Sequence, residues 1–195
     1  MTTTPPPDPT RRSDRAHRAI LEATGQLIEE RGFAATSIDQ IAERAGVGKQ
    51  TIYRWWPNKA AVVLAYAQQA ARGVRDPDSG SLRGDLRQLA ADLCRMFGDT
   101  PGGRVCIALI GAAQTDPEFA QTFRETFTSS RRATVREALR RGQERGEVRG
   151  DIDLEAAADM LYGPIWYRRL VGHAPLTTGF AHTLADAVAT AVKPH

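Results

Sequence analysis

The sequence predicts an all-α protein made of an amino-terminal helix-turn-helix region and a larger helical carboxyl-terminal region. Three observations support this fold class. Apolar residues recur at helical spacing along most of the chain, the alternation typical of strands is absent, and segments rich in glycine and proline separate the helical runs. The length of 195 residues, with 42% hydrophobic and 25% charged residues, suits a folded chain of one or two domains.

The first element we expect is a flexible arm over residues 1–12, because residues 1–10 include four prolines and cannot hold a helix. Arg11 and Arg12 end this arm. A helix then begins at Ser13 and closes at Gly32. Its apolar face is formed by Ile20, Leu21, Thr24, Leu27 and Ile28.

Two short helices are expected next, completing a domain over residues 13–58. Thr36 or Ser37 can cap the first of them, and Gly46 supplies a tight turn before the second, which spans residues 48–56. A connecting helix is expected over residues 59–75, and the turn-rich residues 76–81 mark the domain boundary. The first short helix directs four apolar residues inward: Ile38, Ile41, Ala42 and Ala45.

The region 82–195 is expected to form a second helical domain. The run 105–113 is almost entirely apolar, so we expect that helix to be buried. Pro117 begins a long helix, and Gly163 with Pro164 bends a later one. The expected helices lie at residues 82–97, at 105–113, from 117 onward, from 153 to 171, and after Pro175.

Composition also limits the class of protein. The longest apolar runs, residues 60–67 and 105–113, are far shorter than the ~20 residues that span a bilayer. The amino terminus lacks the charged and apolar pattern of a signal peptide, and two cysteines cannot build a disulfide framework. We therefore expect a reduced, cytoplasmic protein with no membrane association.

The segment 36–59 carries the most specific signal. Two short helices joined by a glycine-containing turn are typical of a DNA-binding helix-turn-helix, whose second helix enters the major groove. Lys49, Gln50 and Thr51 stand at the start of that helix, where their side chains can contact base edges. No acidic residue occurs from Arg44 to Arg75, although the stretch holds six lysines and arginines. The local charge favours an anionic partner.

This segment resembles the DNA-binding domain of the tetracycline-repressor (TetR) family of bacterial regulators. The matching residues are Gly32, Phe33, Thr36, Ser37, Ile41, Ala42, Ala45, Gly46, Val47, Thr51, Ile52, Tyr53, Trp56 and Lys59. In the carboxyl-terminal region, residues 153–155 and 162–164 resemble one subtype of the family's ligand domain. Trp55 departs from the pattern, because the family often has His or Tyr there.

The resemblance implies an all-helical homodimer that binds double-stranded DNA. Its interface would be formed by the last two helices, roughly residues 153–172 and 177–192, and each protomer would enclose a pocket for a small effector. The candidate DNA-binding residues are Thr36, Lys49, Gln50, Thr51, Tyr53, Arg54, Trp55 and Lys59. Ile52 and Trp56 are expected in the core of the three-helix unit.

An effector pocket would be lined by residues of the second region, although a stripe at helical spacing also suits plain core. Trp166 and Tyr167 follow the Gly163–Pro164 bend, where an amphipathic aromatic could form a pocket wall. The candidates are Leu89, Leu93, Met96, Phe97, Ile107, Ile110, Phe123, Phe127, Trp166 and Tyr167. Cys94 and Cys106 are expected to be buried and inert.

The function predicted from these patterns is a DNA-binding regulator, a repressor released by a small apolar or amphipathic effector. No phosphate-binding glycine loop, nucleophile elbow or metal-ligand spacing is present, so we expect no catalytic site, metal or cofactor. Two alternatives stay open. One is an effector-independent regulator or activator controlled by a protein partner, and the other is a small-molecule-binding protein that no longer reads DNA.

Overall fold

The computed structural model describes residues 9–194, in which the regular secondary structure is helical and there is no strand. Helix α1 (Pro9–Ala35) begins inside the range expected for the flexible arm, because proline is well tolerated in the first helical turn. The rest of that arm, residues 1–8, lies outside the described residues. At Gly32 the backbone leaves the helical conformation, with φ of 78° and ψ of 170°, so the regular helix stops there as expected.

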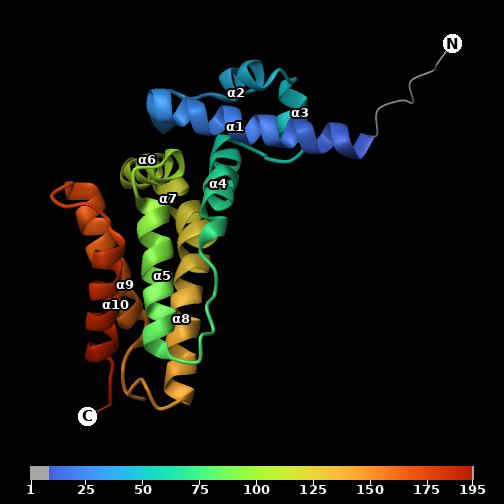
Figure 1. The fold of residues 1–195 in the computed structure, drawn as a ribbon. Coiled ribbons are helices and arrows are strands. Elements are labelled where there is room, and N and C mark those ends of the chain that lie inside the picture. Colours follow the sequence, from blue (N-terminus) through green and yellow to red (C-terminus); the bar gives the residue numbers. More distant parts are fainter. Residues whose placement is uncertain (1–8, 195) are drawn as a thin grey trace.

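Helix α2 (Ile38–Ala45) packs against α1, and α3 (Lys49–Tyr53) packs against α2 (Figure 1). Ser37, rather than Thr36, caps α2: its hydroxyl accepts from the Gln40 amide, and the Gln40 side chain accepts from the Ser37 amide. The turn after α2 depends on Gly46, whose φ of 64° is left-handed. Helix α3 is shorter than the predicted 48–56, because the chain leaves the helix after Tyr53.

Helix α4 (Lys59–Ala70) connects the two parts of the molecule and runs from α1 toward the carboxyl-terminal bundle (Figure 1). It stops before the predicted residue 75 and ends in a 3₁₀ turn, Ala71–Gly73. The chain then follows an extended path to α5 (Leu82–Phe97), which runs beside α8 (Ser129–Glu144) in the centre of the bundle.

The bundle is completed by α6 (Pro101–Thr115) and α7 (Pro117–Phe123), which lie beneath α1, and by α9 (Leu154–Val171) and α10 (Thr178–Ala191), which lie on the side of α5 away from α4 (Figure 1). The long helix predicted from Pro117 is interrupted: a π-helical segment, Arg124–Thr128, joins α7 to α8. Helix α9 continues through Pro164 without ending.

The sequence-based expectation for α6 needs two corrections. The helix begins at Pro101 instead of near residue 105, because Thr100 caps it by accepting a hydrogen bond from the Gly103 amide. It is also less buried than its apolar composition suggests. Of its large apolar residues, only Val105, Cys106 and Leu109 are buried, whereas Ile107 and Ile110 are partly exposed.

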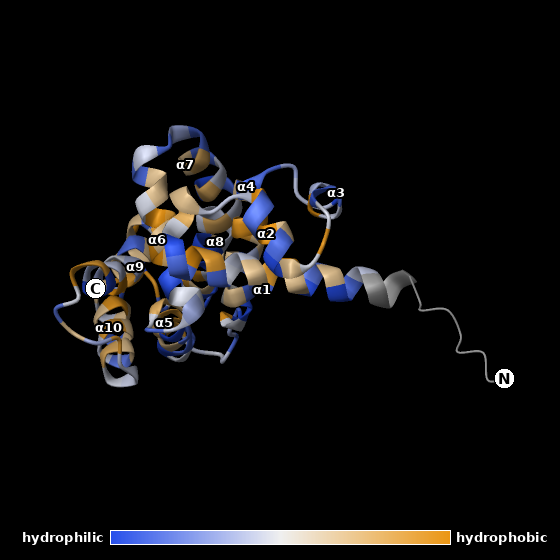
Figure 2. Ribbon diagram, turned by 90° about the horizontal axis from the view of Figure 1, so that it is seen from above, coloured by the Kyte–Doolittle hydropathy of each residue, from blue (hydrophilic) through white to orange (hydrophobic). Residues whose placement is uncertain are grey.

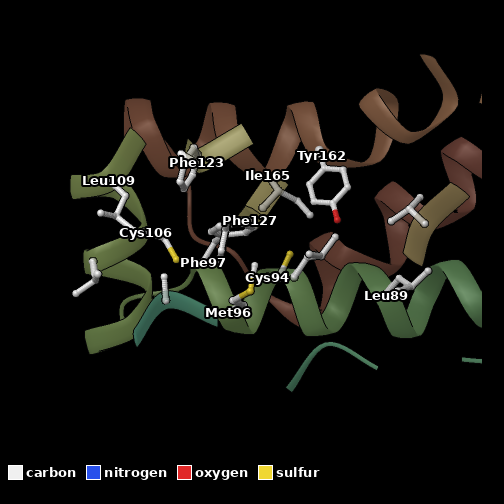
Figure 3. Close-up of a cluster of buried hydrophobic side chains, with 14 of the residues drawn as sticks. Leu89, Cys94, Met96, Phe97, Cys106, Leu109, Phe123, Phe127, Tyr162 and Ile165 are labelled. Atoms are coloured by element: carbon white, nitrogen blue, oxygen red, sulfur yellow. The ribbon is translucent and has the colours of Figure 1, made fainter. Parts of the chain in front are cut away.

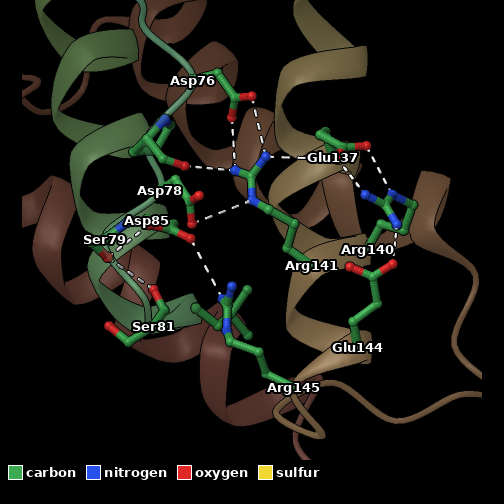
Figure 4. A network of polar contacts seen from close by, with 12 residues as sticks. Asp76, Asp78, Ser79, Ser81, Asp85, Glu137, Arg140, Arg141, Glu144 and Arg145 are labelled. Atoms are coloured by element: carbon green, nitrogen blue, oxygen red, sulfur yellow. Dashed lines mark hydrogen bonds and ion pairs between the residues drawn. The ribbon is translucent and has the colours of Figure 1, made fainter.

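A polar cluster fixes the extended segment before α5 to the side of α8 (Figure 4). Arg141 donates to the Asp76 carboxylate at 2.8 Å and to the Pro77 carbonyl at 2.6 Å. The buried Asp85 carboxylate accepts from both the backbone amide and the hydroxyl of Ser79, each at 2.7 Å. These bonds hold the linker after α4 against the bundle.

The bundle core is filled by aromatic, aliphatic and sulfur-containing side chains from α5, α6, α9 and the α7–α8 region (Figure 3). Viewed from above, apolar positions gather where the helices face one another, while α1 and α3 present polar positions to solvent (Figure 2). In residues 9–194, every helix is too short or too polar to cross a membrane.

Candidate functional site

Helix α3 is held by two buried side chains. Ile52 is fully buried and Trp56 is 7% exposed, which confirms their predicted place in the core of the three-helix unit. The ring of His17, on α1, lies 4.8 Å from the Trp56 ring and 5.4 Å from the Trp55 ring. This aromatic packing fixes the orientation of α3 relative to α1.

The opposite face of α3 is exposed and polar. Lys49, Gln50, Tyr53 and Arg54 all point their side chains to solvent, and Tyr53 is 47% exposed although it is a large aromatic. Helix α3 projects at the edge of the molecule in the top view (Figure 2). Such a row suits contact with base edges and phosphates in the major groove.

Lys49 forms an ion pair with Asp39 of α2. The hydrogen bond to this carboxylate raises the pKa of Lys49, so the side chain stays cationic. Both groups are more than half exposed, so solvent screens the pair and the lysine can exchange this partner for a nucleic-acid acceptor.

A groove of about 540 Å³ separates α3 from the amino-terminal half of α1. Thr51, Arg54 and Trp55 line it from one side, and Ser13 and Ala16 of α1 line it from the other. The contribution of Ser13 and Ala16 was missed by sequence reasoning. In the sequence, Ser13 and Ala16 precede Ile20 by seven and four residues, so helical periodicity places both on the same side of α1 as its apolar face.

Two predicted DNA-binding residues lie elsewhere and support the fold. The Lys59 ammonium donates to the Phe33 carbonyl at 2.9 Å and sits 4.3 Å from the centre of the Phe33 ring, and burial lowers the pKa of Lys59. Thr36 is 2% exposed, and its hydroxyl donates to the Gly32 carbonyl at 2.8 Å. Both residues secure the end of α1, and neither extends the exposed row of α3.

A second candidate site is a cavity of about 220 Å³ in the carboxyl-terminal bundle. It lies between the α7–α8 junction and α9, and Phe97 closes it from α5. The rings of Phe97 and Trp166 are 4.0 Å apart. The complete lining is Phe97, Phe127, Thr128, Arg131, Arg132, Asp159, Tyr162, Gly163 and Trp166.

The cavity combines aromatic walls with a polar side. The guanidinium of Arg131 lies 5.6 Å from the centre of the Phe127 ring, and burial lowers the pKa of Arg131. The Tyr162 hydroxyl donates to the Arg131 carbonyl at 2.9 Å, and burial raises the pKa of this phenol. Arg132 forms ion pairs with Asp159 and with Glu155. An amphipathic molecule suits such a lining.

Of the ten predicted pocket residues, three line this cavity: Phe97, Phe127 and Trp166. Leu89, Leu93 and Phe123 are buried in the core instead. Met96 borders another cavity, between α4 and α5. Ile107 and Ile110 are partly exposed on α6, and Tyr167 is 61% exposed on α9 and packs against His173.

Sequence reasoning missed the polar half of the cavity. Tyr162 precedes Trp166 by four residues, so helical periodicity alone places both on the same face of α9. Arg131 similarly follows Phe127 by four residues. Arg131 and Arg132 belong to a run of charged residues, and such runs are typical of solvated helix faces, so charge alone does not place them in a cavity.

The cysteines behave as core residues. Both are buried, and burial raises the pKa of Cys94 to about 11 and that of Cys106 to about 12. Across residues 9–194, no group of three His, Cys, Asp or Glu side chains is placed to hold a metal ion.

Comparison with known proteins places both regions in one family. Residues 20–66 match the model of "Bacterial regulatory proteins, tetR family", and residues 76–188 match "Tetracyclin repressor-like, C-terminal domain". The chain is 42% identical over 161 residues to the uncharacterized HTH-type transcriptional regulator YdeS of Bacillus subtilis (strain 168), covering 82% of this chain and 81% of that protein.

Solved structures agree with these matches. The TetR family transcription regulator SCO0332 is 33% identical, with a TM-score of 0.74 over 92% of this chain and 99% of that one. The flavonoid-responsive regulator FrrA shares the fold, with 24% identity and a TM-score of 0.70 over 93% of this chain and 99% of that one. The chain therefore belongs to the TetR family of transcriptional regulators and carries that family's DNA-binding helix-turn-helix domain.

Proposed function

We propose that this transcriptional regulator is a repressor that binds its operator through the exposed face of α3 and is released by a small effector. The observation that carries the proposal is the row Lys49, Gln50, Tyr53 and Arg54, held outward by the buried Ile52. Arginine and lysine contact phosphates and guanine, and glutamine pairs with adenine. TetR-family regulators are transcription factors rather than enzymes, so no catalytic role is assigned.

The protein acts as a homodimer in this proposal, because operator half-sites need two α3 helices about one helical turn apart. Four large apolar side chains on α9 support the interface predicted for the last two helices. Met160, Tyr167, Leu170 and Val171 are between 41% and 61% exposed. Exposed apolar side chains that cluster on one surface favour a contact with a partner, here a second copy of α9 and α10.

The effector occupies the cavity lined by Phe97, Trp166 and Arg131. Its volume of about 220 Å³ is below the ~300–1000 Å³ of pockets that hold drug-sized ligands. The effector is therefore compact, with an apolar body against the aromatic rings and a polar group facing the arginines. A structural relative that is described as flavonoid-responsive is consistent with an aromatic ligand.

Fluorescence anisotropy tests the DNA-binding part. The purified protein is titrated onto labelled DNA from upstream of its own coding region and onto scrambled DNA of equal length, across a salt series. We expect a preference of at least ~10³-fold and a steep salt dependence. Thr51→Ala should relax the base preference by about 1–3 kcal/mol, whereas Thr115→Ala, an exposed threonine on α6, should leave it unchanged.

The same assay separates the alternatives. Equal and weak binding of both DNAs would favour a small-molecule-binding protein that no longer reads DNA. Specific binding that no compact aromatic compound reverses would favour a regulator or activator controlled by a protein partner. Specific binding, with release that Trp166→Ala abolishes while operator affinity stays the same, supports the repressor.

A further inference from the structure

The π-helical segment Arg124–Thr128 lies between the effector cavity and the helix that leaves the DNA-binding domain. On one side, Phe127 and Thr128 line the cavity. On the other, the segment packs against α4, and the Gln68 side chain of α4 donates to the Thr126 carbonyl at 3.3 Å. Thr126 therefore contacts α4, while the next two residues, Phe127 and Thr128, face the cavity.

The hydrogen bonding of this segment is unlike that of the helices on either side. The Ser129 amide donates to the Arg124 carbonyl, five residues earlier instead of four. Such a turn holds one more residue than an α-helical turn, and π-turns inside helices frequently mark functional sites. A return to α-helical bonding would rotate the residues of the segment relative to the neighbouring helices.

Hydroxyl groups stabilise carbonyls within and beside the π-turn. The Thr126 hydroxyl donates to the Thr122 carbonyl at 2.7 Å, and the Ser129 hydroxyl donates to the Glu125 carbonyl at 2.5 Å. The Ser130 hydroxyl donates to the Phe127 carbonyl at 3.1 Å. These hydroxyl groups can keep the carbonyls hydrogen-bonded when the backbone changes from π-helical to α-helical bonding. Such a change therefore leaves fewer carbonyls without a partner than it would without the hydroxyl groups.

We propose that this π-helical segment couples the cavity to α4, with Gln68 as the positioning residue on α4. In the π register, Phe127 faces the cavity while the Thr126 carbonyl accepts from Gln68. A ligand that displaces Phe127 favours the α register, which moves the Thr126 carbonyl away from α4. The coupling rests on the proposed function, because it gives occupancy of the cavity a route to the DNA-binding domain.

Hydrogen–deuterium exchange of the full-length protein tests the coupling without DNA or effector. Gln68→Met keeps the length of the side chain and removes the donor, and Gln69→Met is the matched control on the exposed side of α4. We expect Gln68→Met to raise amide exchange in residues 124–130 by about two- to tenfold, the range that corresponds to one lost hydrogen bond. Equal exchange in the two variants would overturn the proposal.

Deletion of Glu125, an exposed residue of the π-turn, provides a second variant. The deletion removes the extra residue, so the turn becomes α-helical while the flanking helices keep their faces. We expect a folded protein with faster exchange in the last turn of α4. An unchanged α4 would contradict the coupling, because the register would then be irrelevant to that helix.

A duplex from upstream of the coding region completes the experiment. Where anisotropy shows that this DNA binds specifically, binding should change exchange in residues 124–130 of the wild type and of Gln69→Met, but not of Gln68→Met. An unchanged wild type would refute the coupling while leaving DNA binding intact. Failure to bind DNA would refute only the proposed function, and the measurements without DNA would still decide the coupling.

Discussion

Helix α4 touches the bundle where its last turn meets the first turn of α6, and the contact depends on the absence of a side chain. A Cβ atom at Gly102 would lie 2.8 Å from the Cβ atom of Ala70. Carbon atoms in contact prefer ~3.5–4.0 Å, so Gly102→Ala creates an overlap of about 1 Å. The Ala70 methyl group is attached to the backbone and cannot rotate away. The two helices must therefore move apart.

The expected cost follows from this overlap. Forcing an additional methyl group into a packed contact costs about 1–3 kcal/mol. Replacing glycine by alanine in a helix returns roughly 0.5–1 kcal/mol, and less in the first turn. Gly111→Ala is the matched control, because a Cβ atom there meets nothing within 4 Å on the same helix. We expect Gly111→Ala to stabilise the protein and Gly102→Ala to be about 1–3 kcal/mol less stable than it.

Urea unfolding followed by circular dichroism measures this difference in stability, and fluorescence anisotropy without urea measures the operator affinity of the same variants. Ala70→Gly in the Gly102→Ala background restores the space and should recover most of the loss. If Gly102→Ala stabilises the protein as much as Gly111→Ala does, α4 and α6 are not in the described contact. Unchanged operator affinity in a destabilised Gly102→Ala variant would show that the position of α4 does not influence DNA binding.

Three further predictions concern ionisable groups. Cys94 and Cys106, whose pKa values are raised to about 11 and about 12 by burial, should resist iodoacetamide at neutral pH in the native protein and react after unfolding in denaturant. The hydrogen bond from Arg87 on α5 lowers the pKa of Asp186. Asp186→Asn removes the carboxylate charge that this bond stabilises, so the variant should be less stable than the wild type at neutral pH. In urea titrations this deficit should vanish as the pH falls below 3.8 through the folded-state pKa, because protonation removes the same charge. Asp39→Asn should strengthen operator binding about two- to fivefold at low salt, because Lys49 then has no ion pair with Asp39 to break when it binds DNA. The same substitution should give no gain in a Lys49→Ala background.

The helix-turn-helix could be predicted in detail because its determinants are local in the sequence. A capping serine, a left-handed glycine and inward residues such as Ile52 each act within a few positions of the element they define. Contacts between residues that are far apart in the sequence could not be predicted from such local patterns. Lys59 was assigned to DNA by its charge and motif, yet it binds the Phe33 carbonyl, 26 residues earlier in the chain.

The sequence predicted a pocket in the carboxyl-terminal region, but which residues line the cavity found there depends on how the helices pair. Periodicity identifies an apolar face on each helix. It does not show whether that face packs in the solid core or lines a cavity, because both environments favour apolar residues. Phe123 and Phe127 share one face and their rings stack 5.2 Å apart, yet only Phe127 lines the cavity. Periodicity could place Tyr162 on the same face of α9 as Trp166, but it could not show that this face borders a cavity, because that depends on how α9 pairs with the other helices.

The free-energy change expected for Gly102→Ala at the α4–α6 contact is similar to the coupling free energy that regulation requires. An effector that changes DNA affinity 5–150-fold needs a coupling free energy of only ~1–3 kcal/mol. One methyl group between Ala70 and Gly102 costs about the same, since their Cβ atoms would lie 2.8 Å apart. The overlap is relieved by a displacement of about 1 Å, so a shift of this size between α4 and α6 falls in the free-energy range that such coupling requires. Because α4 also contacts the Thr126 carbonyl, the proposed change of register in the π-helical segment would act on the same helix as this α4–α6 contact.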